Sequence, residues 1–442
     1  MRAPTDIEQK VLKRWQLSTF SVMLFGYVGY YLCRKNITAA LPLLAEAFDY
    51  SKTDLGKIGS VALIVYGIGK LINGPLGDKI GGRKIFLIGM IGAIAANLLF
   101  AAGNSLTWFI IVWSFGHYFL SMGWGGLAKT VGAWCPPEKN GTVMGFISIN
   151  FQFGGVVATL LAGAIVAAGY SWQYVFIFPA EILAIVFIWS FFASKAHPNA
   201  VYPDVEFPPA SSKPIAEIHR EDESIEEEHV NPIEVMKTLF SLKLFRILLV
   251  YSALTTILRS IFFFWTALLF TDIGLNIKDA IFKSAMFPLA GCIGTIFIGW
   301  YTDHKVKDGN RARMMWYMLA GLTVSLIAMA IFSQGNNVNT TLIVTLTALS
   351  GFFLLGPYSM SSGALTLDIA GSRGAGTCTG LIDGIGYLSA SASIYLSGWM
   401  SENYGWSSVF YLLVICSALS TLCCFYMDRI HQAKNKEIHP RD

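Results

Sequence analysis

The chain has 442 residues, of which 54% are hydrophobic and only 14% are charged, with a net charge of +4. Because a soluble protein carries about 25% charged residues, this composition excludes an ordinary soluble domain. The apolar residues gather in long runs, and roughly 20 apolar residues suffice for a helix to cross a bilayer. The chain is therefore predicted to be an all-α integral membrane protein.

Twelve apolar segments follow one another along the chain. Their approximate limits are 16–44, 54–77, 84–103, 107–130, 140–168, 171–193, 243–271, 279–302, 313–333, 339–368, 372–400 and 405–428. A stretch rich in proline and acidic residues interrupts them and is typical of a polar linker. We therefore predict an N-terminal six-helix half over residues 1–193, a cytoplasmic linker over 194–242 and a C-terminal six-helix half over 243–442.

Lysine and arginine gather at four places: the N-terminus, the loops after the second and eighth segments, and the C-terminus. With twelve spans, all four lie on one side of the membrane. By the positive-inside rule both termini and the linker are cytoplasmic. This use of basic residues reflects topology, so no nucleic acid is expected as a partner.

The two halves repeat each other. Arg34 precedes Gly74 by 40 residues, and Arg259 precedes Gly299 by 40 residues. Further matching pairs occur in the same order, at offsets of 225 to 235 residues. Duplicated halves around a central site are the common plan of secondary transporters.

Arg34 and Arg259 occupy equivalent positions of this repeat, each near the middle of its segment. A cation at bilayer depth costs about 2.5–3.5 kcal/mol on insertion scales, so it is rarely without a role. Two arginines facing each other across a cavity can bind the oxygens of a phosphate in bidentate fashion. The alternative is that each arginine pairs with a structural carboxylate. Asp383 is the main acidic residue at membrane depth.

Three lysines are further candidates. Lys35 neighbours Arg34 but points about 100° away around the helix. Lys70 either draws an anion inward or pairs with Asp383, and Lys129 is either a cavity lysine or a snorkelling interfacial one. Asp383 itself can neutralise a cation in the empty site, bind sugar hydroxyls or carry a proton, and the sequence does not separate these roles.

Several polar side chains within the apolar segments can stack on or hydrogen-bond a ligand. They are Tyr27, Tyr30, Tyr31, Tyr358, Tyr387 and the amides Asn36, Asn150 and Gln152. Core packing is the alternative for each tyrosine. His117 is interpreted as a packing or helix-contact residue rather than a proton carrier. No catalytic triad, metal-ligand cluster or nucleotide-binding loop is present at a sensible spacing, so we expect no enzymatic activity, no metal and no cofactor.

A charged motif, Gly74-x-x-x-Asp78-x-x-Gly81-Gly82-Arg83-Lys84, follows the second segment. Glycine permits close helix contact, and an acid beside a cation or helix end can latch one conformation. We therefore predict a conformational latch at Asp78 and Arg83, with Asp303 in a degenerate second copy. The alternative is ordinary topogenic charge. The motif resembles the loop signature of the major facilitator superfamily.

The run Tyr30-Tyr31-Leu32-Cys33-Arg34-Lys35-Asn36 resembles the first-span motif of the organophosphate:phosphate antiporters of that superfamily. Gly69-Lys70, Met122-Gly123-Trp124 and Leu258-Arg259 also fit. The resemblance implies a major facilitator fold of twelve transmembrane helices in two pseudo-symmetric halves. It also implies alternating-access exchange of an organic phosphate for inorganic phosphate. Arg34 and Arg259 would then clamp the phosphate, with Lys35 and Lys70 beside them.

Two departures from the family pattern bear on the substrate. The run Phe151-Gln152-Phe153-Gly154-Gly155 lacks the histidine found there in glycerol 3-phosphate and hexose-phosphate carriers, and Asp383 stands where glycerol 3-phosphate carriers have glycine. Both favour a larger, hydroxyl-rich sugar phosphate such as hexose 6-phosphate. The alternatives are a membrane sensor of external sugar phosphate and a proton-coupled anion carrier that uses Asp383. We expect a monomer in membrane lipid, in the bacterial cytoplasmic (inner) membrane.

Overall fold

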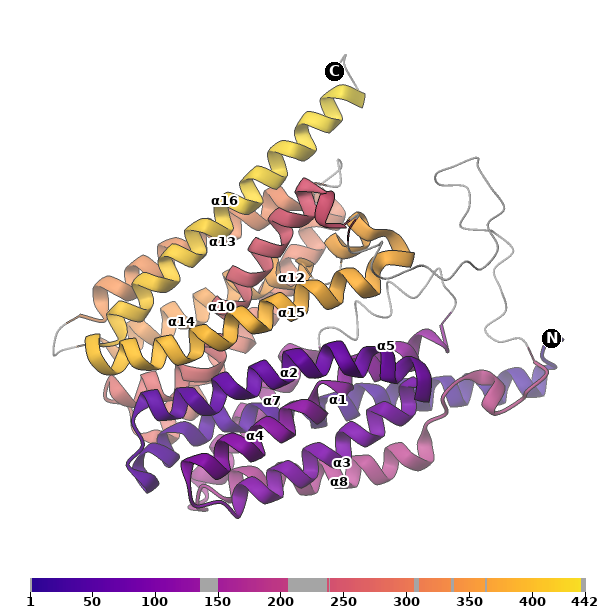
Figure 1. The fold of residues 1–442 in the computed structure, drawn as a ribbon, viewed down its shortest axis with the longest axis horizontal. Coiled ribbons are helices and arrows are strands. Elements are labelled where there is room, and N and C mark those ends of the chain that lie inside the picture. Colours follow the sequence, from indigo (N-terminus) through magenta and orange to yellow (C-terminus); the bar gives the residue numbers. More distant parts are fainter. Residues whose placement is uncertain are drawn as a thin grey trace.

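The computed structural model describes residues 2–135, 150–205, 237, 239–305, 310–334, 338–361 and 364–438. Long helices run side by side in two groups, the earlier part of the chain forming one and the later part the other (Figure 1). The first group is α1 Asp6–Phe48, α2 Lys52–Ile80, α3 Gly82–Ala101, α4 Leu106–Leu120, α5 Met122–Gly132, α7 Asn150–Ala167 and α8 Tyr174–Ala193, followed by the short η1 Pro198–Ala200.

The second group begins after the linker. It consists of α10 Lys243–Asp272, α11 Ile277–Ser284, α12 Met286–Lys305, α13 Arg311–Phe332, α14 Thr340–Ser361, α15 Ala364–Tyr404 and α16 Trp406–Ile438. Each of the twelve predicted segments contains helix. The fourth and the eighth are each built from two consecutive helices, which meet at Ser121 and at Ala285. At the second break Pro288 lacks the N–H that would donate to the carbonyl of Ser284, so the α-helical ladder is interrupted there.

Nine helical stretches of the described residues are long and apolar enough to cross a membrane. The helices α1 and α15 fall outside this group because tyrosines, serines and charged residues at their centres lower their mean hydropathy. The predicted all-α membrane fold class is therefore confirmed. A total of twelve spans fits these helices and still rests on the sequence pattern.

The first helix is longer than a membrane is thick. Its 43 residues extend about 65 Å at about 1.5 Å per residue, against a hydrocarbon core of about 30 Å. Its first turns pack outside the bundle, where Leu12 contacts Trp134 and Val205 in a small apolar cluster. The backbone N–H of Arg2 donates to the carbonyl of Asp204 at 2.9 Å. The start of α1 and the end of α16 lie toward the same end of the bundle (Figure 1).

The opposite end of the interface between the two groups is tightly closed. Lys52 at the start of α2 forms an ion pair with Asp272 of α10 at 2.7 Å, and the backbone N–H of Thr53 donates to Glu402 of α15 at 3.0 Å. A Cβ at Gly398 would lie 2.7 Å from the carbonyl oxygen of Lys52, so the helices meet at backbone distance. We call this region the closed end.

The turn between α2 and α3 explains one part of the charged motif. Gly81 has a φ of 96°, a conformation that favours glycine. Arg83 then donates through Nε to the Ser194 hydroxyl at 2.9 Å and through Nη2 to the Phe191 carbonyl at 2.5 Å. Arg83 thus anchors the end of α8 within its own half. The side chains of Asp78 and Asp303 lie outside the described part of the structure, so the predicted latch stays a prediction.

Candidate functional site

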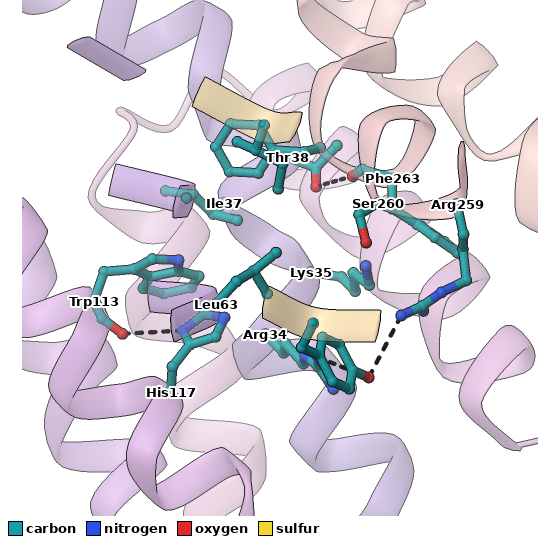
Figure 2. A pocket seen from close by; sticks show the side chains of 14 residues that line it. Arg34, Lys35, Ile37, Thr38, Leu63, Trp113, His117, Arg259, Ser260 and Phe263 are labelled. Carbon is teal, nitrogen blue, oxygen red and sulfur yellow. Dashed lines mark hydrogen bonds between the residues drawn. The ribbon is translucent and has the colours of Figure 1, made fainter. Parts of the chain in front are cut away.

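A small pocket lies between the two groups of helices and is lined by residues of both (Figure 2). Its cavity volume of about 40 Å³ is room for a few waters, so a larger ligand requires the helices to move apart. Both halves contribute lining residues, including Arg34, Lys35, Thr38, Leu63, Trp113 and His117 from the first and Arg259, Ser260, Phe263 and Tyr387 from the second. The two arginines of the sequence repeat therefore open onto one cavity.

One phenol oxygen joins the two arginines. The hydroxyl of Tyr387, on α15, accepts from Nη2 of Arg34 at 3.5 Å and from Nη2 of Arg259 at 3.4 Å. Both bonds are long, so they are weak and easily exchanged. Two guanidinium groups that share one oxygen atom are placed to share the oxygens of a tetrahedral anion instead.

Aromatic rings hold each guanidinium in place. Arg34 donates to the Tyr66 hydroxyl at 3.1 Å and lies 4.1 Å from the centre of that ring. Arg259 lies 4.6 Å from the ring centre of Tyr358. Cation–π contacts of this kind favour a desolvated cation without neutralising it. The Nε atom of Arg259 is buried and has no hydrogen-bond partner in the described structure, so this group retains a donor.

Neither arginine has a carboxylate partner among the described residues. The alternative of a structural arginine–carboxylate pair therefore fails in this part of the chain. Arg34 and Arg259 are 9% and 4% exposed, respectively. Since desolvated unpaired charge is costly, a pocket built in this way favours an anionic occupant.

Lys70 and Asp383 form an ion pair across the interface, at 2.7 Å between Nζ and Oδ2. Lys70 is on α2 and Asp383 on α15, one turn before Tyr387. Both side chains retain 15–16% of their exposure. The described geometry pairs Asp383 with a cation, and its contacts with sugar hydroxyls or a proton stay predictions.

Lys35 faces the pocket beside the arginines rather than away from it. Its ammonium lies 3.8 Å from the ring centre of Phe263, on α10, and it has no carboxylate partner in the described residues. Arg34, Lys35 and Arg259 thus leave three positive charges in one cavity without a paired acid.

The tyrosines of α1 divide between the site and the core. Tyr31 lies beside Arg34, at 5.8 Å from its guanidinium carbon to the ring centre. Tyr27 packs edge-on against Tyr31 at 5.4 Å between ring centres. Tyr30 turns away and donates to the carbonyl of Phe86 on α3 at 2.5 Å, which is a structural contact.

The remaining lysine and amide candidates include Lys129, Gln152 and Asn36. Lys129 is exposed near the end of α5 and does not line the pocket, and the side chain of Gln152 lies outside the described structure. The buried amide Asn36 bonds to Asn97 at 2.7 Å and holds α1 to α3. Sequence reasoning gave no role to Tyr66 and treated His117 as a packing residue. Tyr66 precedes Lys70 by four residues on α2, so both side chains lie on the same face of the helix. This spacing could have indicated that Tyr66 lies near the site.

Comparison with known proteins places this geometry in a family. The model of the Major Facilitator Superfamily matches residues 23–394 and 309–441. A solved structure of a bacterial homolog to human lysosomal transporter Spinster, in an inward-facing and unoccupied conformation, superposes with a TM-score of 0.76 at 13% identity, over 95% of this chain and 98% of that one. This likeness concerns the fold.

Curated relatives extend over nearly the whole chain. A probable hexose phosphate transport protein of Chlamydia pneumoniae is 26% identical, covering 94% of this chain and 92% of that protein. A glycerol-3-phosphate transporter of Bacillus subtilis is 27% identical, covering 91% and 90%. The membrane sensor protein UhpC of Salmonella typhimurium is 26% identical, covering 92% and 90%. These relatives confirm the resemblance inferred from the motifs. The chain belongs to the Major Facilitator Superfamily, a family of membrane transporters and not of enzymes.

Proposed function

We propose that this protein exchanges an organic phosphate, a sugar phosphate such as hexose 6-phosphate, for inorganic phosphate by alternating access. The observation that carries the proposal is the pair of symmetry-related arginines, Arg34 and Arg259, which have no carboxylate partner among the described residues and share the Tyr387 oxygen. The similarity to hexose phosphate and glycerol-3-phosphate transporters supports the same substrate class.

In this mechanism the phosphoryl group displaces the Tyr387 hydroxyl and binds both guanidiniums. Lys35 adds a third positive charge on the side of Phe263. Because the described cavity has room for only a few waters, the two halves separate around the site to admit the ligand. An empty site would have to close around unpaired cations, which costs several kcal/mol. A bound phosphate removes that cost, so exchange is fast and net flux is slow.

The membrane arrangement completes the proposal. Both termini face the cytoplasm by the positive-inside rule, because lysine and arginine gather at the termini and in the loops after the second and eighth segments. The closed end then faces outward. The host membrane is a bacterial cytoplasmic membrane, and the unit is a monomer with one central site.

The test uses purified protein in liposomes loaded with inorganic phosphate, with labelled phosphate outside. We expect rapid uptake that glucose 6-phosphate inhibits and free glucose does not. Arg34→Ala and Arg259→Ala abolish it, whereas Arg246→Ala, at an exposed arginine of α10, leaves it intact. Liposomes without internal phosphate give much slower uptake; equal rates would refute the exchange mechanism.

A second function is a membrane sensor of external sugar phosphate, and the similarity to the sensor UhpC favours considering it. A sensor keeps the arginine pair but transports poorly. Ligand binding without exchange in the same liposomes would therefore select the sensor. A strong dependence of uptake on an imposed proton gradient would instead select a proton-coupled anion carrier.

A further inference from the structure

His117, on α4, is a second kind of polar group in the central pocket. It is 5% exposed, and its Nδ1 lies 3.0 Å from the carbonyl oxygen of Trp113, one turn earlier on the same helix. A carbonyl oxygen only accepts hydrogen bonds, so Nδ1 carries the proton. This contact fixes the tautomer and the orientation of the ring.

The other ring nitrogen, Nε2, is left as the free atom. Among the described residues no donor reaches it, although the ring lines the cavity. The neutral ring suits a pocket that already contains Arg34, Lys35 and Arg259, since another positive charge there would be repelled. With Nδ1 as the donor, Nε2 is an acceptor that has no partner in the described part of the chain.

An acceptor at this place is unsuited to the phosphate itself. The phosphoryl group of a dianionic ester has only acceptor oxygens, whereas the hydroxyls of its organic part can donate. Figure 2 shows His117 and Trp113 on the other side of the pocket from Arg259, with Arg34 between them. A phosphate held by the two arginines therefore leaves the region near His117 to the organic part of the ligand.

We infer that His117 is a specificity-determining residue, whose Nε2 accepts a hydrogen bond from a hydroxyl group of the organic part of the phosphate ester. The inference rests on the proposed function and adds to it a requirement for a donor hydroxyl. A ligand without that hydroxyl leaves a buried acceptor unpaired, which is the condition under which binding sites discriminate most strongly.

The experiment measures binding to the purified full-length protein in detergent, through the shift in thermal unfolding at increasing ligand concentration. At about pH 8 phosphate esters are dianions, because their second pKa is about 6. The probes are glucose 6-phosphate and glycerol 3-phosphate, with hydroxyl-free n-propyl phosphate as the reference. The variants are His117→Phe, which lacks the acceptor, and His117→Gln, which keeps one. Ser114→Ala is the matched control, since Ser114 is also buried on α4 but does not line the pocket.

We expect wild-type protein to bind at least one hydroxylated ester more tightly than n-propyl phosphate. His117→Phe should weaken binding of that ester about tenfold, the value of one hydrogen bond, and leave n-propyl phosphate within about twofold. His117→Gln should recover part of the preference, and Ser114→Ala should retain all of it. The unfolding midpoint without ligand shows whether each variant is folded.

Equal weakening of all three esters by both His117 variants would assign the residue to structure and overturn the inference, and so would an unchanged preference. Both results leave the proposed function standing, because phosphate still binds. If no phosphate compound stabilises the wild type, the proposed function fails and this inference fails with it.

Discussion

The ion pair between Lys70 and Asp383 gives the sharpest test of how α2 and α15 are held together beside the site. Asp383→Asn removes the carboxylate and leaves the Lys70 ammonium between α2 and α15 without a counter-charge. Breaking a fully buried pair in this way costs about 3–5 kcal/mol. Here both side chains keep about one-sixth of their exposure, so solvent recovers part of that energy. We expect a cost of about 2 kcal/mol.

The substitution destabilises the described conformation, in which Lys70 Nζ and Asp383 Oδ2 lie 2.7 Å apart and link the two helices. A conformation in which α2 and α15 have separated is not destabilised in this way. A difference of about 2 kcal/mol shifts the balance between the two by roughly 30-fold. Asp383→Asn should therefore lower the unfolding temperature in detergent and slow phosphate exchange, and Lys70→Gln should do the same. The double variant, with two neutral partners, should recover most of the stability, since nothing is left unpaired.

Measuring all four proteins as a double-mutant cycle isolates the pair. If the double variant loses as much stability as the two single variants together, the pair does not interact in solution and the reasoning is wrong. The phosphate exchange activity of the double variant distinguishes a counter-charge role of Asp383 from direct contact with the ligand or a proton. A double variant that exchanges phosphate shows that the acid is a counter-charge, whereas one that is stable but inactive assigns to it direct contact with the ligand or a proton.

Other expectations follow from the same contacts. Arg34→Lys and Arg259→Lys keep the charge but lose the planar fork, so phosphate exchange should fall by about 100-fold or more in liposomes while the protein still folds. Tyr387→Phe removes only a weak acceptor shared by the arginines; phosphate binding should change by less than about fivefold, and a complete loss would mean that the phenol itself contacts the ligand. Gly398→Ala places a Cβ 2.7 Å from a facing backbone carbonyl and should lower thermal stability, whereas Gly299→Ala, whose Cβ meets nothing within 4 Å, should not.

The sequence alone supported the helices and the arginine pair for a clear physical reason. Bilayer thickness dictates segment length. A cation at membrane depth is costly and therefore rare, so its presence in the sequence indicates a functional site. The repeat then placed Arg34 and Arg259 at equivalent depths, and the structure brings both to one cavity. The boundaries of the two halves and the linker stay predictions from the sequence, because residues 206–236 lie outside the described structure.

The aromatic residues around the arginines could not be sorted in advance. In a membrane the lipid is as apolar as the helix contacts, so hydrophobic periodicity does not reveal which face of a helix turns inward. Tyr30 and Tyr31 are neighbours with the same chemistry, yet one bonds to a carbonyl of α3 and the other lies beside Arg34. His117 shows the same limit. The helix contact expected for this residue exists, through Nδ1, whereas the exposure of its ring to the cavity depends on how α4 packs.

The helix α15 connects the ligand site to the closed end. Asp383, Tyr387, Gly398 and Glu402 recur at spacings of four, eleven and four residues, which place them on one face of the helix. That face meets α2 at the ion pair and again at the closed end, while Tyr387 between them contacts both arginines. Under the proposed mechanism, a phosphate that displaces the Tyr387 hydroxyl changes the contacts of the same helix that forms the closed end. We therefore expect ligand binding and closure of that end to be coupled through α15.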